Sequence, residues 1–215
     1  MCGIIGYYSD NPSNAGSIVV EGLKKMEYRG YDSWGFAIKT KEKIEVEKDI
    51  GPVSCVDVGG GKLCCHAIGH TRWATHGKVT KQNAHPHLSC DGNICVVHNG
   101  IVENYHDLKK ELEKKNYEFQ SDTDTEVIPH LIQEYMKETK NFKESIKKAS
   151  QCLKGRYAFI AICNDFDGLI GIKQGSPLII GHGKNNYFIT SDVVAFAEHT
   201  KKVTYLDDEE MVIIR

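Results

Sequence analysis

The order in which strand-like and helix-like segments follow one another constrains the fold of this chain more than any other feature of its sequence. Apolar residues mostly follow strand patterns at first, then helical spacing through the middle of the chain, and strand patterns again to the end. Helices grouped between two sets of strands favour an α+β fold over a parallel sheet with crossover helices. We therefore expect antiparallel sheets covered by helices.

The individual elements are predicted from the spacing of the apolar residues. Strands are predicted over residues 4–8, 35–48 (two strands with a turn near residues 41–42), 65–71, 94–98, 158–163, 169–172, 178–180, 187–190, 203–206 and 211–214. Helices are predicted over residues 15–26, 105–112, 127–135 and 142–153.

Four local signals add detail to this pattern. Asp10-Asn11-Pro12 is expected to end the first strand, and the run Gly59-Gly60-Gly61 indicates a turn. Thr123-Asp124-Thr125-Glu126 has the pattern of a capping box, which predicts a helix start. Pro129 then falls inside that helix, where we expect it to strain or kink the early turns.

The length and the net charge of the chain limit the classes of protein to which it can belong. A chain of 215 residues can form one domain, over residues 1–215, and bury a sizeable core. Twenty-seven basic and 29 acidic residues give a net charge of −2, which predicts no general attraction to nucleic acid or to anionic membranes. No apolar run approaches the roughly 20 residues that cross a bilayer, and no signal-peptide pattern is present, so we expect a cytoplasmic location.

The chain has eight cysteines, which could form disulfides or remain free thiols. In a cytoplasmic chain of this length we expect reduced thiols, most of them small core residues, rather than a disulfide framework. They stand at positions 2, 55, 64, 65, 90, 95, 152 and 163.

Cys2 is a candidate nucleophile because removal of Met1 would make it the first residue. It would then carry both a thiol, with a reference pKa of about 8.5, and an α-amine, with a reference pKa of about 7.7–8.0. The amine can act as a general base beside the thiol, and Gly3 leaves room for a substrate. The simpler interpretation is a buried small residue at the start of a strand.

Six polar motifs stand near the ends of predicted strands or helices. They are Glu27-Tyr28-Arg29-Gly30-Tyr31-Asp32-Ser33, His70-Thr71-Arg72-Trp73-Ala74-Thr75-His76-Gly77, Asn83-Ala84-His85-Pro86-His87, His98-Asn99-Gly100-Ile101-Val102-Glu103-Asn104, Ser121-Asp122-Thr123-Asp124-Thr125-Glu126 and Gly175-Ser176-Pro177-Leu178.

With the Met1-Cys2-Gly3-Ile4 opening, these motifs resemble, in order, the glutaminase domain of glutamine–fructose-6-phosphate aminotransferases (glucosamine-6-phosphate synthases). That domain belongs to the N-terminal-nucleophile (class II) glutamine amidotransferases. The resemblance covers essentially the whole chain. The opening alone also fits the amidotransferases of purine and asparagine synthesis, whereas the motifs at residues 27–33 and 70–77 point to the sugar branch. The resemblance implies a four-layer αββα sandwich with two antiparallel sheets.

The resemblance also implies a set of catalytic residues. Cys2 corresponds to the nucleophile that attacks the glutamine side-chain amide, with its own α-amine as the base. Asn99, through its side-chain N–H, and Gly100, through its backbone N–H, correspond to the oxyanion hole. Arg29 corresponds to a residue that supports the surroundings of the nucleophile. By itself, Asn99-Gly100 would also fit a plain hairpin turn, and Arg29 a surface ion pair after a helix end.

A second set corresponds to the residues that hold glutamine. Arg72 corresponds to the ligand of the α-carboxylate, which a guanidinium can bind through two parallel hydrogen bonds. Asp124 corresponds to the partner of the α-ammonium, although an acid in the first turn of a helix also has a purely structural explanation. Trp73, Thr75 and His76 correspond to the flap that closes over glutamine, and Gly100 also belongs to the substrate-binding set.

Some positions depart from the pattern of these proteins. Trp34 stands where a small residue is usual, and residues 77–81 replace the usual Gly-Glu-Pro-Ser type of flap sequence. Pro129 replaces a helix-compatible residue soon after Asp124. None of these departures removes a residue with an implied catalytic role.

The resemblance implies L-glutamine as the substrate and neither a cofactor nor a metal. The partner is the sugar-isomerase (synthase) domain, in the same enzyme or as a separate subunit, and a homodimer is a further option. That domain is absent from this chain, which contains no G-x-G-x-x-G or P-loop motif. The predicted function is hydrolysis of glutamine to supply ammonia for converting fructose 6-phosphate to glucosamine 6-phosphate.

Three alternatives are weighed against this function. The first is a free-standing glutaminase subunit of another amidotransferase. The second is a catalytically idle regulatory module with the same fold. The third is a metal-binding module, for which the spacing is poor because no C-x-x-C pair exists. Its candidate ligands are Cys64, Cys65, His66, His70, His85 and His87.

Overall fold

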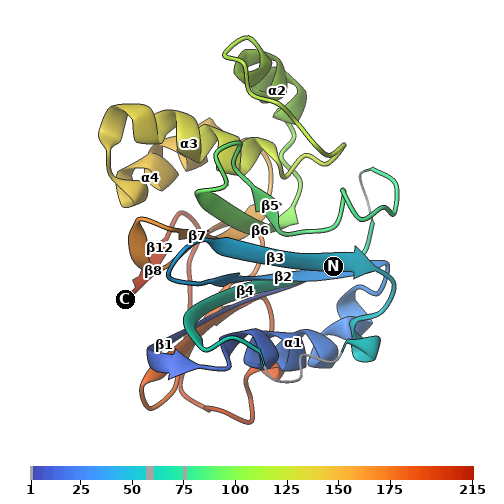
Figure 1. Cartoon of the computed structure of the whole chain (residues 1–215), viewed down its shortest axis with the longest axis vertical. Coiled ribbons are helices and arrows are strands. Elements are labelled where there is room, and N and C mark those ends of the chain that lie inside the picture. The colour runs from blue at the N-terminus through green and yellow to red at the C-terminus, as the bar shows by residue number, and fades with distance from the viewer. Residues whose placement is uncertain (1, 57–60, 75–76) are drawn as a thin grey trace.

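A computed structural model describes residues 2–56, 61–74 and 77–215 of the chain (Figure 1). Its strands form two sheets, and every strand pairing within them is antiparallel. The predicted α+β class with antiparallel sheets is therefore confirmed. Met1, Thr75, His76 and part of the glycine run at 59–61, all named in the sequence predictions, lie outside the described residues.

The larger sheet has seven strands in the order β11–β9–β10–β1–β4–β2–β3. Its strands are β1 (Gly3–Ser13), β2 (Ser33–Lys39), β3 (Ile44–Ile50), β4 (Cys64–Arg72), β9 (Ile179–His182), β10 (Asn186–Thr190) and β11 (Val203–Tyr205).

The smaller sheet has five strands in the order β12–β8–β7–β6–β5. Its strands are β5 (His87–Leu88), β6 (Ile94–Gly100), β7 (Tyr157–Cys163), β8 (Phe166–Gln174) and β12 (Met211–Ile214). The α-helices are α1 (Ala15–Lys25), α2 (Tyr105–Glu113), α3 (Val127–Thr139) and α4 (Phe142–Cys152), and short 3₁₀ turns cover Glu27–Arg29, Val53–Cys55 and Val193–Ala195.

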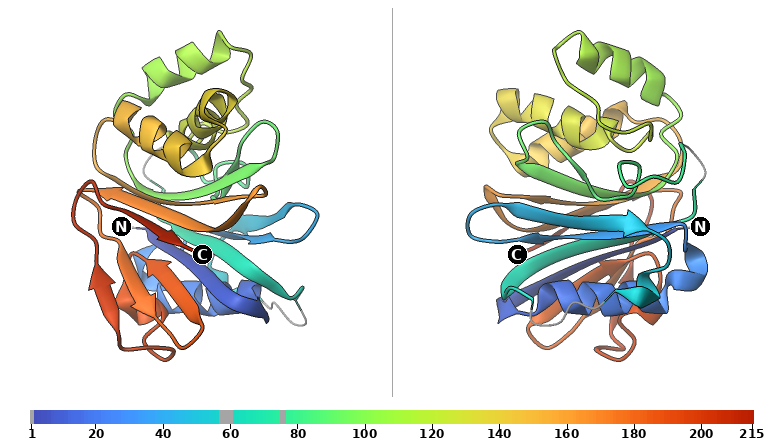
Figure 2. Two further views of the ribbon diagram at one scale, coloured as in Figure 1. Left: turned by 90° about the vertical axis from the view of Figure 1, so that its left-hand side faces the viewer. Right: turned by 45° about the vertical axis from the view of Figure 1, so that its right-hand side comes forward.

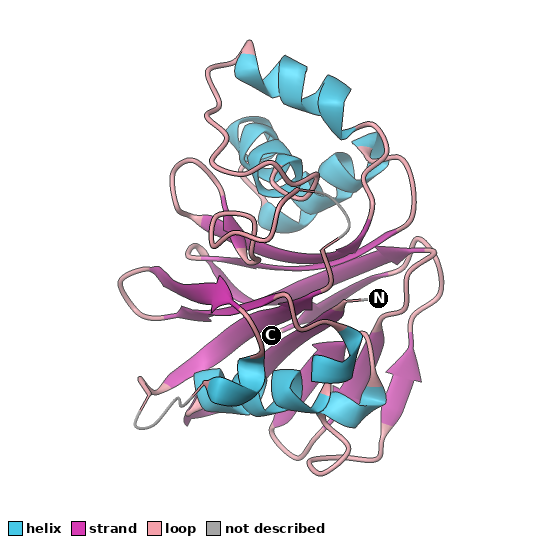
Figure 3. Cartoon of the chain, turned by 90° about the vertical axis from the view of Figure 1, so that its right-hand side faces the viewer, coloured by secondary structure: helices cyan, strands magenta, loops and turns pink. Residues whose placement is uncertain are grey.

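The two sheets pack face to face with helices on both outer faces (Figure 2). Helix α1 covers the seven-stranded sheet, and α3 and α4 cover the five-stranded sheet, with α2 further out. Figure 3 shows the same layers by type, with the strands between the two groups of helices. The predicted four-layer αββα arrangement is thus present.

Strand β7 contributes side chains to two different hydrophobic cores. Side chains alternate between the two faces of a strand. Phe159 packs into the core under α2, α3 and α4, whereas its neighbour Ile160 packs into the core between the sheets. A third core lies between α1 and the seven-stranded sheet and includes Val19, Leu23 and Phe188. The apolar run at 158–163 is buried on both faces, which is why it does not alternate with polar residues.

The predicted strain at Pro129 is wrong. Helix α3 begins at Val127, so Pro129 lies in its first turn. Backbone N–H groups in the first turn have no partner within the helix, so the missing N–H of proline costs nothing there.

The predicted capping box at residues 123–126 is also wrong. The helix N-cap is Glu126, and no side chain caps it. The Glu126 carboxylate instead accepts hydrogen bonds from the backbone N–H groups of Gln120 (2.8 Å) and Ser121 (2.7 Å) and from the Ser121 hydroxyl (2.7 Å). Burial alone would raise the pKa of Glu126, but hydrogen bonds from His130, Gln120 and Ser121 outweigh it and lower that pKa to about 2.

Two further expectations need correction. Strand β1 continues past Asp10-Asn11-Pro12 to Ser13, with a shift in its register against β4. The eight cysteines are all free thiols, as expected, but only Cys64, Cys95 and Cys163 are buried. Cys55 and Cys90 are exposed, so most of the cysteines are not core residues.

Candidate active site

The strand ends bring the predicted site residues together. In the seven-stranded sheet Gly3 of β1 pairs with Thr71 of β4, and Ser33 of β2 pairs with Arg72. The first residues of β1 therefore meet the last residues of β4. Strand β6 of the other sheet ends at Gly100 on the same side of the sandwich, since the Asn99 side chain reaches Cys2.

Cys2 is half-buried at the start of β1. Its thiol lies against Trp73, whose backbone N–H donates a hydrogen bond to Sγ at 3.2 Å, and Sγ lies 3.5 Å from the Trp73 carbonyl oxygen. Burial raises the pKa of the Cys2 thiol, an effect that the Trp73 N–H and the charge of Arg72 oppose. The thiol is therefore mainly protonated, and a nearby base is needed to activate it.

Asn99 and Gly100 are the last two residues of β6, paired with Ala158 and Tyr157, so they do not form a plain hairpin turn. The Asn99 Nδ2 donates a hydrogen bond of 2.8 Å to the Cys2 carbonyl oxygen, which holds the amide group beside Cys2. Gly100 has a φ of +124°, and a Cβ atom there would clash with the Arg156 carbonyl oxygen. Only glycine fits this position without strain.

Arg72 has a buried guanidinium at the end of β4. It donates hydrogen bonds to the carbonyl oxygens of Lys78 at 3.2 Å and Gly77 at 3.4 Å. Burial lowers the pKa of Arg72, and the neighbouring groups Cys2, Asp124 and Asp32 oppose that shift. An arginine stays charged in proteins, so the site contains a buried cation that can bind a carboxylate.

Asp124 is 6% exposed and precedes α3. Its Oδ2 accepts a hydrogen bond of 2.7 Å from the backbone N–H of Val102, two residues after Gly100. Asp124 therefore lies outside the helix rather than in its first turn, and its position is tied to the end of β6. A buried carboxylate so held can pair with an ammonium group.

A cavity of about 30 Å³ joins Cys2, Gly100, Arg72 and Asp124, whereas Asn99 is not part of its lining. It is lined by Cys2, Arg72, Trp73, Gly100, Asp124, His70, His85, His98, Thr123 and Thr125. That volume holds about one water molecule, so a larger ligand requires the surrounding side chains to move. Larger cavities of about 710 and 740 Å³ lie elsewhere and contain neither Cys2 nor Arg72, so we assign the site by its converging polar groups.

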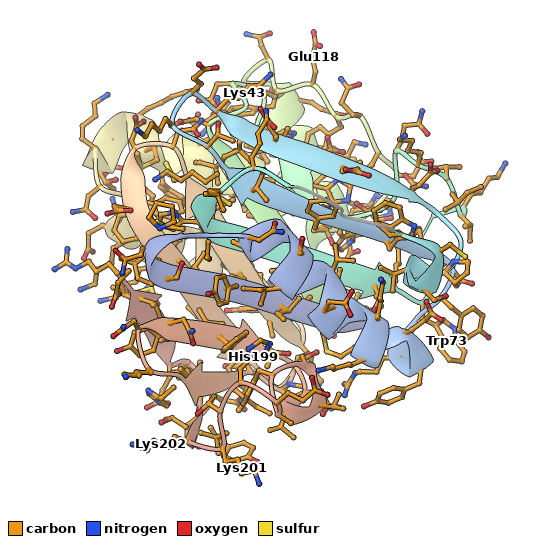
Figure 4. All side chains as sticks on the ribbon, turned by 60° about the horizontal axis from the view of Figure 1, so that its bottom comes forward. Lys43, Trp73, Glu118, His199, Lys201 and Lys202 are labelled. Carbon is orange, nitrogen blue, oxygen red and sulfur yellow. The ribbon has the colours of Figure 1, made fainter. Side chains whose placement is uncertain are left out.

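The backbone of Trp73 contacts Cys2, whereas its ring lies at the surface. The side chain is 49% exposed and projects at the edge of the molecule (Figure 4). Its ring lies beside that of Tyr31, with centroids 5.8 Å apart. Gly30 allows this close approach, because a Cβ atom there would come within 2.7 Å of the Trp73 nitrogen.

Arg29 connects Cys2 to a more distant loop. Its Nε donates to the Cys2 carbonyl oxygen at 3.3 Å, and its Nη1 forms an ion pair with Asp192 at 2.5 Å. Tyr28 donates a further hydrogen bond of 2.6 Å to Asp192. Burial would raise the pKa of Asp192, but hydrogen bonds from Tyr28, the Val194 N–H and Arg29 outweigh it and lower that pKa. Arg29 is thus both an ion-pair residue and a neighbour of Cys2.

The sequence indicated His70 and His85 only as candidate metal ligands and gave no role to His98, yet all three line the cavity beside Cys2. The rings of His70 and His85 stack with centroids 4.0 Å apart, and His98 Nδ1 lies 2.8 Å from Thr125 Oγ1. Burial lowers the pKa of His70 to about 3 and also lowers the pKa of His85 and His98, so this wall of the cavity is uncharged at neutral pH. The signal was present, because His98 directly precedes Asn99 and His70 stands two residues before Arg72.

Asp32 is a second residue that the sequence did not single out. Its Oδ2 accepts a hydrogen bond of 2.8 Å from the Ala74 N–H, next to Trp73.

For the alternative of a metal-binding module, no group of three or more His, Cys, Asp or Glu side chains among the described residues is arranged to hold a metal ion. Within that same part of the chain, no helix is both long and apolar enough to cross a membrane.

The chain is similar to known glutamine amidotransferases. Residues 70–198 match the family described as "Glutamine amidotransferase domain". The chain is 47% identical over 218 residues to glutamine–fructose-6-phosphate aminotransferase (isomerizing) of Thermococcus kodakarensis, covering 100% of this chain and 36% of that protein. The enzyme of the same name from Clostridium perfringens is 45% identical over 222 residues, with 100% and 35% coverage. The chain thus spans about a third of the length of these curated relatives.

Two solved structures share the fold. One is glutamine phosphoribosylpyrophosphate amidotransferase from B. subtilis, complexed with ADP and GMP, with a TM-score of 0.80 and 31% identity over 99% of this chain and 47% of that chain. The other is described as the allosteric regulatory enzyme of purine biosynthesis, with a TM-score of 0.82, 31% identity and the same coverage. The four-layer fold expected from the motifs is therefore confirmed as that of the N-terminal-nucleophile amidotransferases.

Proposed function

Because the chain belongs to the glutamine amidotransferase domain family, as its motifs predict, we propose that it hydrolyses L-glutamine to glutamate and ammonia. The observation that carries the proposal is a single cavity that exposes the Cys2 thiol, the Arg72 guanidinium and the Asp124 carboxylate. A thiol, a cation and an anion match the amide, the α-carboxylate and the α-ammonium of one glutamine molecule.

The nucleophile in this proposal is the Cys2 sulfur. It attacks the side-chain amide carbon of glutamine, and the α-amine of Cys2, released by removal of Met1, takes the thiol proton. The resulting tetrahedral intermediate loses ammonia, which receives that proton, and leaves a thioester on Cys2. Attack by water on the thioester then releases glutamate and restores the thiol.

The negative charge that forms on the amide oxygen needs two donors. We assign them to Asn99 Nδ2 and the Gly100 N–H. In support, one hydrogen of Asn99 Nδ2 is engaged by the Cys2 carbonyl oxygen, and the NH₂ group has a second. Fixed donors of this kind contribute about 3–4 kcal/mol to catalysis in other acyl-transfer sites.

The binding groups for the two charged ends of glutamine are Arg72 and Asp124. Each is buried, and each is held by a backbone partner, Arg72 by the Lys78 carbonyl and Asp124 by the Val102 N–H. Trp73, Thr75 and His76 complete the proposed flap. Arg29 acts as a positioning residue, since its contact is with the Cys2 carbonyl oxygen and not with the thiol.

We further propose that the ammonia serves conversion of fructose 6-phosphate to glucosamine 6-phosphate in a sugar-isomerase domain. The names of the relatives and their greater length support this acceptor. The domain would be joined to this chain or form a separate subunit. A cytoplasmic location and a homodimer are consistent parts of the same proposal.

The test is an assay of glutamate and ammonia released by the purified chain, combined with intact mass. We expect equal amounts of both products from chain that has lost Met1, and none from chain that retains it, because the α-amine is then an amide. Treatment with the electrophilic glutamine analogue 6-diazo-5-oxo-L-norleucine should label Cys2. Hydrolysis by chain that retains Met1 would contradict the role of the α-amine, and absence of hydrolysis in both forms would contradict the function.

A further inference from the structure

Asn83 lies outside the cavity but touches both loops that carry its charged groups. The side chain is 1% exposed. Its Nδ2 donates a hydrogen bond of 3.0 Å to the Lys78 carbonyl oxygen, and its Oδ1 accepts one of 2.9 Å from the Asp122 N–H. One amide group therefore joins the segment after Trp73 to the loop before α3.

The first of these contacts leads to Arg72. The Lys78 carbonyl oxygen that accepts from Asn83 also accepts from Arg72 Nη1 at 3.2 Å. Asn83 and Arg72 thus share one acceptor, so the amide fixes the group against which the guanidinium is oriented. The Asn83 backbone N–H also donates to Thr80 Oγ1 at 3.2 Å, which closes the turn between them.

The second contact leads to Asp124. Asp122 precedes it by two residues, and the intervening Thr123 is itself held, with Oγ1 3.0 Å from Ser121 Oγ and 3.2 Å from His87 Nε2. The loop from Asp122 to Asp124 is therefore fixed at its start by Asn83 and at its end by the Val102 N–H.

We propose that Asn83 is a positioning residue that sets the spacing between the Arg72 cation and the Asp124 anion. The α-carboxylate and α-ammonium of an amino acid are attached to the same carbon, so their two partners must be held at one separation to bind both at once. By fixing that separation, Asn83 makes the site selective for α-amino acid amides over simple amides. This inference rests on the proposed glutaminase function.

The experiment compares Asn83→Ala with Gln82→Ala on three amides. Gln82 is the exposed neighbour, and its backbone carbonyl oxygen accepts a hydrogen bond of 3.2 Å from Lys48 that alanine can keep, so its variant is a matched control. The substrates are L-glutamine, glutaramic acid, which lacks the α-amine, and 4-aminobutanamide, which lacks the α-carboxylate. Initial rates give kcat and KM for each, and thermal unfolding monitors the fold.

We expect Asn83→Ala to raise the KM for glutamine about tenfold, the effect of losing two ordinary hydrogen bonds, with kcat within about twofold of the parent. The preference for glutamine over each truncated amide should shrink by a similar factor, and Gln82→Ala should match the parent. An equal loss of kcat/KM on all three amides would mean a purely structural role and would overturn the inference.

Asn83→Asp separates the two contacts and serves if the alanine variant does not fold. The carboxylate keeps an acceptor for the Asp122 N–H but has no donor for the Lys78 carbonyl. We expect the preference for glutamine over 4-aminobutanamide to fall, and the preference over glutaramic acid to persist. Equal loss of both preferences, or of neither, would contradict the proposed coupling.

A measurement without turnover distinguishes this inference from the function on which it rests. We expect Asn83→Ala to slow labelling of Cys2 by 6-diazo-5-oxo-L-norleucine, while labelling of Cys2 by iodoacetamide, followed by peptide mass, stays unchanged. Parent protein that neither hydrolyses glutamine nor forms the first adduct would overturn both proposals. Active parent with unchanged selectivity in Asn83→Ala would overturn the role of Asn83 alone.

Discussion

At the scale of single residues, Cys2 is held by groups from three distant parts of the chain. Trp73 donates its N–H to the sulfur, and Asn99 and Arg29 donate to the carbonyl oxygen. Burial raises the pKa of the thiol, and the Trp73 N–H and the charge of Arg72 oppose that shift. The chemistry of this residue therefore depends on its neighbours as much as on its type.

The first prediction concerns the nucleophile itself. Cys2→Ala should lower glutamine hydrolysis at least about a thousandfold, because the covalent path is lost. The half-buried side chain makes few core contacts, so the free energy of unfolding should change by no more than about 1 kcal/mol. Product assays and urea unfolding measure the two effects. Turnover at the parent rate in Cys2→Ala would show that another group performs the reaction.

The second prediction concerns recognition of the α-carboxylate. Arg72→Ala should raise the KM for glutamine about 10- to 100-fold, the usual effect of losing a hydrogen bond to a charged group. Hydrolysis of 4-aminobutanamide, which has no carboxylate, should be much less affected and serves as the internal control. If kcat/KM for glutamine were the same in parent and variant, Arg72 would have no part in binding.

At the scale of elements, β4 ends at the candidate site and carries several buried polar groups. His66 and His70 lie within it, and Arg72 ends it. Burial lowers the pKa of His66 to about 4 and of His70 to about 3. Burial in β4 thus keeps His66 and His70 uncharged at neutral pH, whereas Arg72 at the end of the strand stays charged.

These shifts predict how stability depends on pH. Below about pH 6.5 histidines in the unfolded chain bind protons that His70 in the folded chain does not, so the free energy of unfolding should fall as the pH drops from 7.5 to 5. His70 contributes about 1–2 kcal/mol of that fall. Urea unfolding at both pH values should show a smaller loss in His70→Asn than in the parent.

The control for this comparison is His106→Gln, which changes an exposed ring on α2. Its loss of stability between pH 7.5 and 5 should equal that of the parent. An identical loss in His70→Asn would mean that the buried ring takes up a proton in the folded state as readily as in the unfolded one.

The end of β6 supports a prediction about backbone geometry. Gly100 and Gly92 both have a positive φ, of +124° and +69°, but only a Cβ at Gly100 would meet other atoms. Gly92→Ala should therefore cost about 1 kcal/mol from its backbone conformation alone. Gly100→Ala should cost clearly more and also reduce glutamine hydrolysis. Equal costs for the two variants would show that the contact with Arg156 relaxes freely.

At the scale of the whole molecule, the sandwich holds the site where its two sheets meet. Arg72 ends a strand of the seven-stranded sheet and Cys2 directly precedes another, whereas Asn99 and Gly100 come from the five-stranded sheet. The core between the sheets, which contains Ile4 and Val97, fixes one set of residues against the other. Local loops then complete the cavity.

The prediction at this scale separates ammonia release from its use. Incubated with glutamine and fructose 6-phosphate, the 215-residue chain should form glutamate and ammonia in equal amounts and no amino sugar. A phosphate site is normally built from backbone N–H groups at a glycine-rich turn or helix start with nearby Lys or Arg, and the glycine run at residues 59–61 has only Lys62 nearby and no helix signal after it. Separate assays of the three products provide the measurement, and formation of glucosamine 6-phosphate would reveal a second active site.

The sequence by itself determines the structural features that depend on local patterns of residues. Apolar spacing predicts nearly every strand and helix, because side-chain period depends only on the geometry of the element. The predictions failed where a distant partner decides the local outcome. Glu126 binds the backbone at Gln120 and Ser121 rather than capping α3, and Pro129 lies in the first turn of that helix, where its missing N–H costs nothing.

Only the tertiary structure decided how the site is assembled. The motifs predicted Cys2, Asn99 and Arg72 as site residues, but Asn99 lies 97 residues from Cys2, and nothing in their local sequence shows that one donates to the other. The contacts of Asn83 with Lys78 and Asp122 could not be predicted from the sequence either, because they form only where two loops meet at the end of the sandwich. Residue types can be recognised from sequence, whereas burial, shared acceptors and pKa shifts arise only when the sheets pack together.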